Sequence, residues 1–317
     1  MSYNRRAVID VGTNSVKLLV ADVEGREVRP ICEESKQTRL GQGFYESHLL
    51  QAEPIAKTTK AVMNFASEAR ALNAERIRVI ATSAARDATN SQELVSALET
   101  ASGLKVEIIS GEQEAEWVFQ GVTTDAALAK KPLLLLDVGG GSTELILGQG
   151  EHKHFQESFP LGTVRLLEKL PHSDPPQPEE LMACRGWLRS FLRKEVQPKL
   201  GGELSRETKV HSANSAVQLV GTGGTTSILA RMELKLEDFD RGKIEAARLS
   251  LERLRWHVEH LWSLPLAERQ KIVGLPTKRA DVILTGSAIY EAVMEVFGFA
   301  ELRVSTRGLR FAAVMDG

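Results

Sequence analysis

Residues 8–20 read VIDVGTNSVKLLV, and residues 134–147 read LLLDVGGGSTELIL. The two stretches carry one signature. A constant offset pairs Asp10 with Asp137, Gly12 with Gly139 and Ser15 with Ser142. Each stretch is typical of an apolar strand that ends in Asp, a turn of small residues, and a second strand of alternating apolar residues. The repeat predicts an α/β fold in which one structural unit occurs twice.

The small-residue turns of both copies are suited to binding phosphate. The backbone N–H groups of a glycine-rich turn can converge on an anion because no side chain stands in the way, and the neighbouring Asp can hold a cation or water. Ordinary hairpin turns also contain Asp-Gly and Gly-Gly pairs. Two copies in register favour the phosphate interpretation, in which two facing turns hold one phosphate chain from both sides.

Length and composition indicate a globular enzyme of two domains. The 317 residues exceed what one typical hydrophobic core organises. Hydrophobic residues make up 42% and charged residues 26%, and no apolar run approaches the roughly 18 residues of a membrane span. The N-terminal MSYNRRAVID enters a strand without an apolar signal region, so we expect a cytoplasmic protein with no membrane association.

Charge and cysteine content narrow the classes of ligand. The formal net charge of −2 gives no general attraction to nucleic acid, so a polyphosphate or nucleotide has to meet local positive charge. Cys32 and Cys184 are the only cysteines and lie far apart in the sequence, which suggests neither a disulfide framework nor a thiolate metal site.

Hydrophobic periodicity predicts alternating strands and helices. In the first half we expect strands at 18–23, 28–32, 76–81 and 106–109 and helices at 53–72, 92–101 and 112–121. In the second half we expect strands at 133–137, 144–147, 154–159 and 217–220, a long helix from Pro178, and a helix-rich region at 249–297. We expect a final strand and helix at 302–314 to complete the first domain. The predicted domains are 1–124 with about 302–317, and 125–301.

The sequence resembles the exopolyphosphatase and guanosine pentaphosphate phosphohydrolase (Ppx/GppA) family in its short two-domain form. The segments that match, in the family's order, are DVGTNS, SKQTRLGQG, ATSAARDATN, ISGEQEA, DVGGGSTEL and GTGGTT. The resemblance covers nearly the whole chain. It implies two ribonuclease H-like domains flanking a cleft, the fold of actin, sugar kinases and chaperones. Longer members append a helical domain resembling HD phosphohydrolases, and no His-Asp dipeptide is present here.

The resemblance implies hydrolysis of a terminal phosphoanhydride. The substrate would be inorganic polyphosphate, with release of orthophosphate, or guanosine pentaphosphate (pppGpp). Most of the barrier reduction in such a reaction comes from positioning a water in line and neutralising phosphoryl charge. Asp137 and Glu144 match the family's carboxylates associated with Mg²⁺, for which Mn²⁺ is an alternative, and Asp10 is the equivalent residue in the first copy. Carboxylate oxygens are ligands that Mg²⁺ selects.

The segment ISGEQEA carries the candidate base. Glu114 matches the family's catalytic glutamate, which would accept a proton from the attacking water. The family acid that precedes it is Gln113 here, which leaves Glu112 as an alternative base. Without the resemblance, both acids would be interpreted as charges favoured at a helix N-terminus.

Two arginines and three glycine-rich turns complete the predicted phosphate site. Arg39 and Arg86 match family arginines that contact substrate phosphates, a task suited to the planar guanidinium fork. The remaining predicted contacts are Asn14, Ser15, Gly140, Gly141, Ser142, Thr143, Gly223, Gly224 and Thr225. The third turn, GTGGTT, could cradle further phosphates or an adenosine, and it has neither a Walker lysine nor a full dinucleotide pattern. A small-molecule kinase and a nonhydrolytic nucleotide or polyphosphate sensor are therefore the alternative functions, and a homodimer is one assembly open to the chain.

Overall fold

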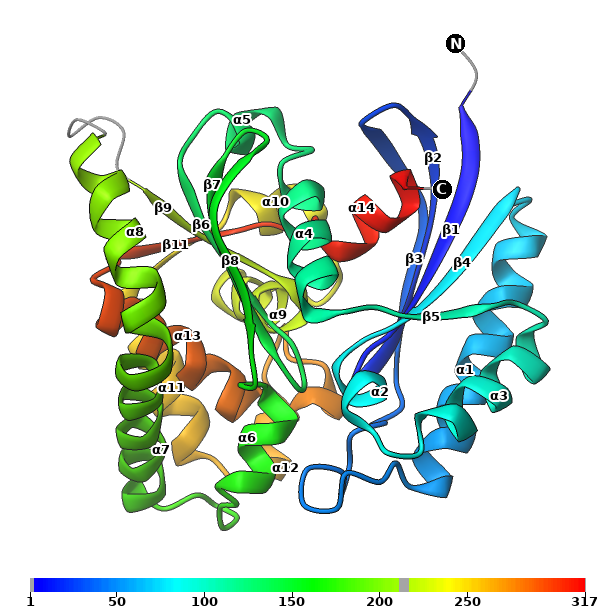
Figure 1. Cartoon of the computed structure of the whole chain (residues 1–317). Coiled ribbons are helices and arrows are strands. Elements are labelled where there is room, and N and C mark those ends of the chain that lie inside the picture. The colour runs from blue at the N-terminus through cyan, green and yellow to red at the C-terminus, as the bar shows by residue number, and fades with distance from the viewer. Residues whose placement is uncertain (1–2, 211–216, 317) are drawn as a thin grey trace. The chain divides into compact units, whose positions relative to one another are not determined.

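The computed structural model of the chain describes residues 3–210 and 217–316 (Figure 1). Its contacts divide the chain into two compact units, which are described separately. Unit 1 contains the described residues up to Asp125, the turn Gly139–Ser142 and the residues from Arg307 onward. Unit 2 contains Ala126–Val138 and the described residues of Thr143–Thr306. Among the described residues, no helix combines the length and the apolar character that crossing a membrane requires.

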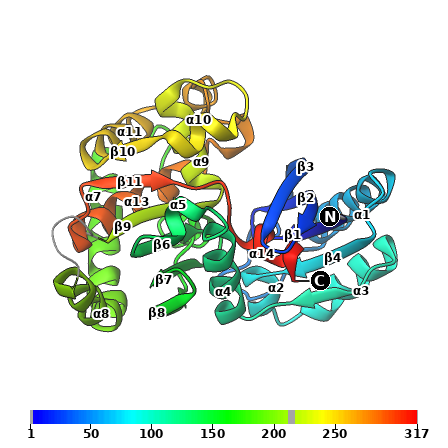
Figure 2. The same cartoon turned by 90° about the horizontal axis from the view of Figure 1, so that it is seen from above.

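Unit 1 is built on a five-stranded sheet (Figure 2). Its strands are β1 (Asn4–Val11), β2 (Ser15–Glu24), β3 (Glu27–Gln37), β4 (Arg76–Ala81) and β5 (Val106–Ile108), in the order β3-β2-β1-β4-β5. The first three strands are antiparallel, whereas β4 pairs in parallel with β1 and β5 with β4. The turn between β1 and β2 therefore lies at the same edge of the sheet as the end of β4, where the polar site residues of this unit begin.

The helices of unit 1 are α1 (Ala52–Ala71), α2 (Ser83–Asp87), α3 (Ser91–Ser102), α4 (Gly111–Val122) and α14 (Leu309–Met315). The buried face of α1 repeats at helical spacing through Val62, Phe65 and Ala69, which pack into the core formed with the sheet. Helices α4 and α14 approach very closely, because a Cβ on Gly121 would lie 2.0 Å from the carbonyl oxygen of Gly308. The last helix of the chain thus supports the helix that carries the predicted base.

Unit 2 repeats this sheet with one added strand. Its strands are β6 (Leu133–Val138), β7 (Thr143–Gln149), β8 (His152–Phe159), β9 (Gln218–Thr222), β10 (Arg248–Ser250) and β11 (Glu301–Val304), in the order β10-β11-β9-β6-β7-β8. Strands β6, β7 and β8 are antiparallel, and β9 and β11 follow in parallel, as β4 and β5 do in unit 1. The sequence repeat is therefore a repeat of topology, and the predicted fold of two ribonuclease H-like α/β units is confirmed.

The helices of unit 2 are α5 (Ala126–Ala129), α6 (Thr163–Lys169), α7 (Pro178–Phe191), η1 (Leu192–Val196), α8 (Gln197–Val210), α9 (Gly223–Leu234), α10 (Arg241–Ala246), α11 (Leu251–Ser263), α12 (Leu266–Arg269), η3 (Thr277–Arg279) and α13 (Ile283–Phe297). The long helix begins at Pro178 as predicted, because Gln177 and Glu180 form a capping box in front of it. Helix α13 is buried on all sides from Ile283 to Met294 and lies within the core of the unit.

The final strand differs from the prediction. Leu302 of β11 pairs with Leu219 of β9, so this strand belongs to the sheet of unit 2 and only α14 belongs to unit 1. The physical reason is the repeated topology: β11 pairs in parallel with β9, as β5 pairs in parallel with β4 in unit 1. The three-residue strand β10 is too short to show a periodic pattern and was not predicted. Residues 1–2, 211–216 and 317 of the predicted domains lie outside the described residues.

Candidate active site

The turns of the two repeated hairpins close in the same way. Gly12 N donates to Ser15 O at 3.0 Å, and Gly139 N donates to Ser142 O at 2.9 Å. A Cβ on Gly12 would lie 3.2 Å from Ser15 O, and one on Gly139 would lie 3.0 Å from Ser142 O. Both glycines are thus favoured by the tightness of the turn, and the equivalence predicted from sequence extends to backbone geometry.

Gly141 lies against a group of hydroxyls within unit 1. A Cβ on this glycine would lie 2.2 Å from the Tyr45 OH, 2.4 Å from the Ser83 Oγ and 2.8 Å from the Thr13 Oγ1. A Cβ on Gly140 would likewise lie 2.9 Å from the Thr13 Cβ. Three hydroxyls from separate segments of the chain therefore pack directly against Gly141 and leave no room for a side chain there. Thr13 and Ser83 lie in the matched segments DVGTNS and ATSAARDATN but were not predicted to contact phosphate, and Tyr45 lies outside the matched segments.

The loop that carries Arg39 is attached to the first turn by backbone hydrogen bonds. Thr38 N and Arg39 N both donate to Asn14 O, at 3.1 and 3.0 Å, and Gly41 N donates to Thr13 O at 2.8 Å. Arg39 has a φ of 55°, which is unfavourable for a residue with a side chain and is often found at functional sites. Its side chain is exposed. The structure thus positions Arg39 directly beside Asn14.

Arg86 and Glu114 form an ion pair within unit 1. The Arg86 Nη1 donates to the Glu114 Oε2 at 3.1 Å and to the Ile109 carbonyl at 3.2 Å. Glu114 lies in the first turn of α4, which Ser110 caps by accepting from Gln113 N. The Glu114 side chain is only 12% exposed, whereas Glu112 points to solvent. The geometry therefore favours Glu114 over Glu112 as the positioned carboxylate.

Asp137 and Glu144 face each other across two strands of unit 2. They occupy directly paired positions of β6 and β7, where like charges destabilise the sheet unless a cation compensates them. Glu144 is 1% exposed and accepts from the Ser158 Oγ at 2.7 Å. Gly223 has a φ of +87°, and a Cβ there would lie 2.3 Å from the Asp137 Oδ1. Two opposed carboxylates with a close glycine turn fit a hard divalent cation.

Asp10 has a different electrostatic environment from its counterpart Asp137. The residue paired with Asp10 across β1 and β2 is Lys17, and the Lys17 Nζ lies 3.9 Å from the Asp10 Oδ2. Lys17 therefore occupies the position that Glu144 has in the second copy. The first copy contains its own counter-charge, so the structure brings no second carboxylate to Asp10 in this register, and its role as a metal ligand stays a prediction.

The third glycine-rich turn opens α9. A Cβ on Gly224 would lie 3.7 Å from the Nη2 of Arg279, a residue that the sequence analysis missed because it lies far along the chain. Beneath this turn Tyr290 is fully buried, and its hydroxyl donates toward the carbonyls of Leu136 and Thr222 at 3.1 and 3.0 Å. Burial raises the Tyr290 pKa, and the charge of Asp137 raises it further. Tyr290 thus stays neutral and links the ends of β6 and β9.

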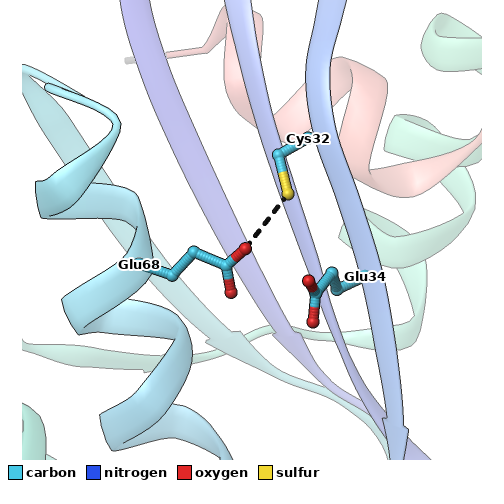
Figure 3. Close-up of side chains that lie close together, drawn as sticks. All are labelled: Cys32, Glu34 and Glu68. Atoms are coloured by element: carbon cyan, nitrogen blue, oxygen red, sulfur yellow. Dashed lines mark hydrogen bonds between the residues drawn. The ribbon is translucent and has the colours of Figure 1, made fainter.

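A separate cluster in unit 1 contains Cys32, Glu34 and Glu68 (Figure 3). The Cys32 Sγ donates to the Glu68 Oε1 at 3.3 Å. Burial, followed by the hydrogen bond to Glu68, raises the Cys32 pKa to about 11, and burial together with Glu68 raises the Glu34 pKa. The thiol is therefore protonated at neutral pH. Within the cluster, the Cys32 thiol is a hydrogen-bond donor to Glu68.

Comparison with known proteins places this geometry in a family. Residues 19–316 match the model of the Ppx/GppA phosphatase family. Exopolyphosphatase 2 of Mycobacterium tuberculosis is 33% identical over an alignment that covers 96% of each chain. The solved structure of the Aquifex aeolicus PPX-GPPA enzyme aligns with a TM-score of 0.77 at 29% identity, covering 99% of this chain and 100% of that one.

A second solved structure, an exopolyphosphatase from Cytophaga hutchinsonii, aligns with a TM-score of 0.84 at 25% identity and covers 99% of this chain and 98% of its own. The matches extend across both units. They confirm the resemblance inferred from the motifs and the expected class of enzyme, a hydrolase of phosphoanhydrides. The chain belongs to the Ppx/GppA phosphatase family.

Proposed function

We propose that the protein is an exopolyphosphatase, which hydrolyses the terminal phosphoanhydride of inorganic polyphosphate and releases orthophosphate. The names of its relatives support this substrate. The observation that carries the proposal is the ion pair of Glu114 with Arg86, because it presents a fixed carboxylate in the unit that also contains two glycine-rich turns. Membership of a phosphatase family favours hydrolysis over the kinase and sensor functions.

Glu114 acts as the general base in this proposal. Its carboxylate accepts a proton from the attacking water, the water oxygen bonds to the terminal phosphorus, and the bond from phosphorus to the bridging oxygen breaks. The shortened chain leaves with the bridging oxygen and its negative charge. The two hydrogen bonds of the Arg86 Nη1, to Ile109 and to Glu114, keep the carboxylate in one orientation.

The positive groups neutralise charge on the phosphoryl oxygens. Arg39 and Arg86 supply guanidinium groups, which bind phosphate oxygens in a planar fork. Asp137 and Glu144 would hold Mg²⁺ or Mn²⁺, and such an ion, when bound, supplies charge neutralisation at the transferring group. The chain's own contribution is to orient these carboxylates, since Ser158 donates to Glu144 and Gly223 leaves room beside Asp137.

Metal dependence and the two carboxylates test the proposal together. Orthophosphate release from polyphosphate should require Mg²⁺ or Mn²⁺ and stop in chelator. Asp137→Asn and Glu144→Gln should each lower turnover at least about a hundredfold, because each weakens the binding of the cation that would balance charge on the transferring group. Asp10→Asn is the matched comparison, and it should have a smaller effect because Lys17 already balances Asp10. Full activity in chelator, or unchanged turnover in both carboxylate variants, would contradict the metal assignment.

A further inference from the structure

Ser83 presents a buried hydroxyl that has no protein partner. It is the first residue of α2, two residues after the end of β4, and is 2% exposed. Its Oγ makes no hydrogen bond to any residue that the structure describes. A buried hydroxyl normally finds a partner, since leaving a donor unsatisfied away from water is costly. An unpartnered hydroxyl of this kind therefore needs an explanation.

The position of the Ser83 hydroxyl supplies an explanation. The Ser83 Oγ faces Gly141 closely enough that a Cβ there would lie 2.4 Å from it. Three residues further along α2, Arg86 pairs with Glu114, and residues three apart on a helix lie on the same face. Ser83 thus lies between a glycine-rich turn and the arginine that orients the proposed base.

Asn14 provides a second donor in the same unit. It is 4% exposed, and its Oδ1 accepts from the Gln37 Nε2 at 3.0 Å, while its Nδ2 has no partner within residues 3–210 and 217–316. The backbone N of Asn14 would lie 3.2 Å from a Cβ on Gly140. The turn Gly140–Gly141 therefore lies against the Ser83 hydroxyl of α2 and against the backbone N of Asn14, a residue of the first repeat whose side-chain amide is also a buried donor.

We propose that the Ser83 hydroxyl is a direct ligand of the terminal phosphate and that it donates, together with the Asn14 amide, to the phosphate's non-bridging oxygens. The inference rests on the proposed function for the identity of the substrate. A phosphate oxygen accepts several hydrogen bonds and would satisfy both donors at once. Gly141 is required in this arrangement because a Cβ there would collide with the Ser83 Oγ and displace the hydroxyl.

Ser83→Ala tests the proposal through two measurements that a structural role would not produce together. The variant removes an unpartnered hydroxyl, so the melting temperature without ligand should equal or exceed that of wild type. The rise in melting temperature on adding inorganic phosphate should shrink, since ligand stabilisation follows affinity. The kcat/KM for polyphosphate should fall about tenfold to a hundredfold, as expected for a lost hydrogen bond to a charged group.

Thr58→Val is the matched control. Thr58 on α1 is also fully buried, and its Oγ1 also lacks a partner, but it belongs to the buried face of α1 and not to a glycine-rich turn. This variant should leave both the phosphate-induced rise in melting temperature and kcat/KM as in wild type. If the two variants changed affinity equally, the effect would belong to packing in unit 1 and not to a phosphate contact.

Two results would overturn the inference. One is a Ser83→Ala variant whose phosphate-induced rise and kcat/KM match wild type. The other is a variant that melts lower without ligand but keeps the full phosphate-induced rise. Failure of the proposed function is distinguishable, because wild type would then release no orthophosphate from polyphosphate, while the comparison of phosphate binding between wild type and Ser83→Ala could still be made.

Discussion

Glu114→Gln separates the catalytic role of this residue from its role in the fold. Glutamine keeps the size of the side chain and can still accept a hydrogen bond from the Arg86 Nη1, now 3.1 Å from the Glu114 Oε2. The change removes one charge from a pair whose side chains are 24% and 12% exposed. Arg86 retains its bond to the Ile109 carbonyl and an Asp87 carboxylate 3.7 Å away. We therefore expect the free energy of unfolding to fall by only about 1 kcal/mol.

The expected loss of turnover is much larger than the loss of stability. General base catalysis contributes about a hundredfold to ten-thousandfold, which at about 1.36 kcal/mol per factor of ten corresponds to roughly 3 to 5 kcal/mol of transition-state stabilisation. Steady-state orthophosphate release and thermal melting of the same protein preparations measure the two quantities. Substrate KM should change little, because the charge that is lost acts on water and not on the phosphate chain.

Glu112→Gln is the control, since Glu112 lies in the same helical turn but is exposed. It should cost at most about 1 kcal/mol through the helix dipole and leave turnover unchanged. If Glu112→Gln lost turnover and Glu114→Gln did not, Glu112 would be the base. Turnover near wild type in both variants would refute a hydrolytic base on α4.

The remaining predictions concern two glycines and a histidine of unit 2. Gly223→Ala should displace the Asp137 carboxylate, because the new Cβ would lie 2.3 Å from its Oδ1. This displacement should lower turnover at least about tenfold and weaken the response to Mg²⁺. The positive φ of Gly223 should add a loss of about 1 to 3 kcal/mol in the free energy of unfolding. Gly186 lies on the exposed face of α7 with open space around it, so Gly186→Ala should instead stabilise the protein by about 0.5–1 kcal/mol and leave turnover unchanged. A larger loss of turnover in Gly186→Ala than in Gly223→Ala would contradict this reasoning. Burial lowers the pKa of His257 despite its hydrogen bond to Glu233, so the unfolded chain binds a proton that the folded chain does not, and stability should fall as the pH drops below about 6.5. Urea midpoints of wild type and His257→Gln at neutral and mildly acidic pH measure this, and an equally steep decline in the variant would assign the effect to other groups.

Local sequence patterns predicted most of the fold because the relevant signals are short-range. The strand Arg76–Ala81 and the helix from Pro178 follow from apolar spacing and capping residues, and both occur as expected. The repeated signature predicted two units, since each copy encodes a hairpin whose turn closes by the same hydrogen bond. The prediction that the last strand joins the first domain was wrong. Strand pairing depends on which sheet edge is open, and that is a property of the assembled sheet.

Site residues that lie in a recognisable motif could be predicted from the sequence, whereas contacts between residues distant in the sequence could not. Glu114 and Arg86 were proposed separately from two motifs, and their ion pair appears only in the structure. The contrast between Asp10 and Asp137 depends on the residue across the strand, which is Lys17 in one copy and Glu144 in the other. That contrast is readable from the repeat once the register is known.

The hydroxyl of Ser83 and the guanidinium of Arg279 illustrate the part of the site that sequence patterns do not report. Ser83 reaches Gly141 from the end of β4, and Arg279 approaches Gly224 from η3. Ser83 lies in the matched segment ATSAARDATN, but the segment does not report which turn its hydroxyl contacts, and neither Ser83 nor Arg279 lies near its glycine in sequence. Only the packing of the strand ends and turns within each unit brings these groups together.

The most direct test of the central claim follows orthophosphate and mean chain length together during hydrolysis of long polyphosphate, with guanosine pentaphosphate assayed in parallel. A terminal hydrolase that uses Glu114 releases one orthophosphate for each bond broken, so the free orthophosphate accounts for all of the shortening and gels show no mid-length fragments early in the reaction. Mean chain length that falls while little orthophosphate appears would contradict attack at the chain end. Orthophosphate from guanosine pentaphosphate but none from polyphosphate would contradict the proposed substrate.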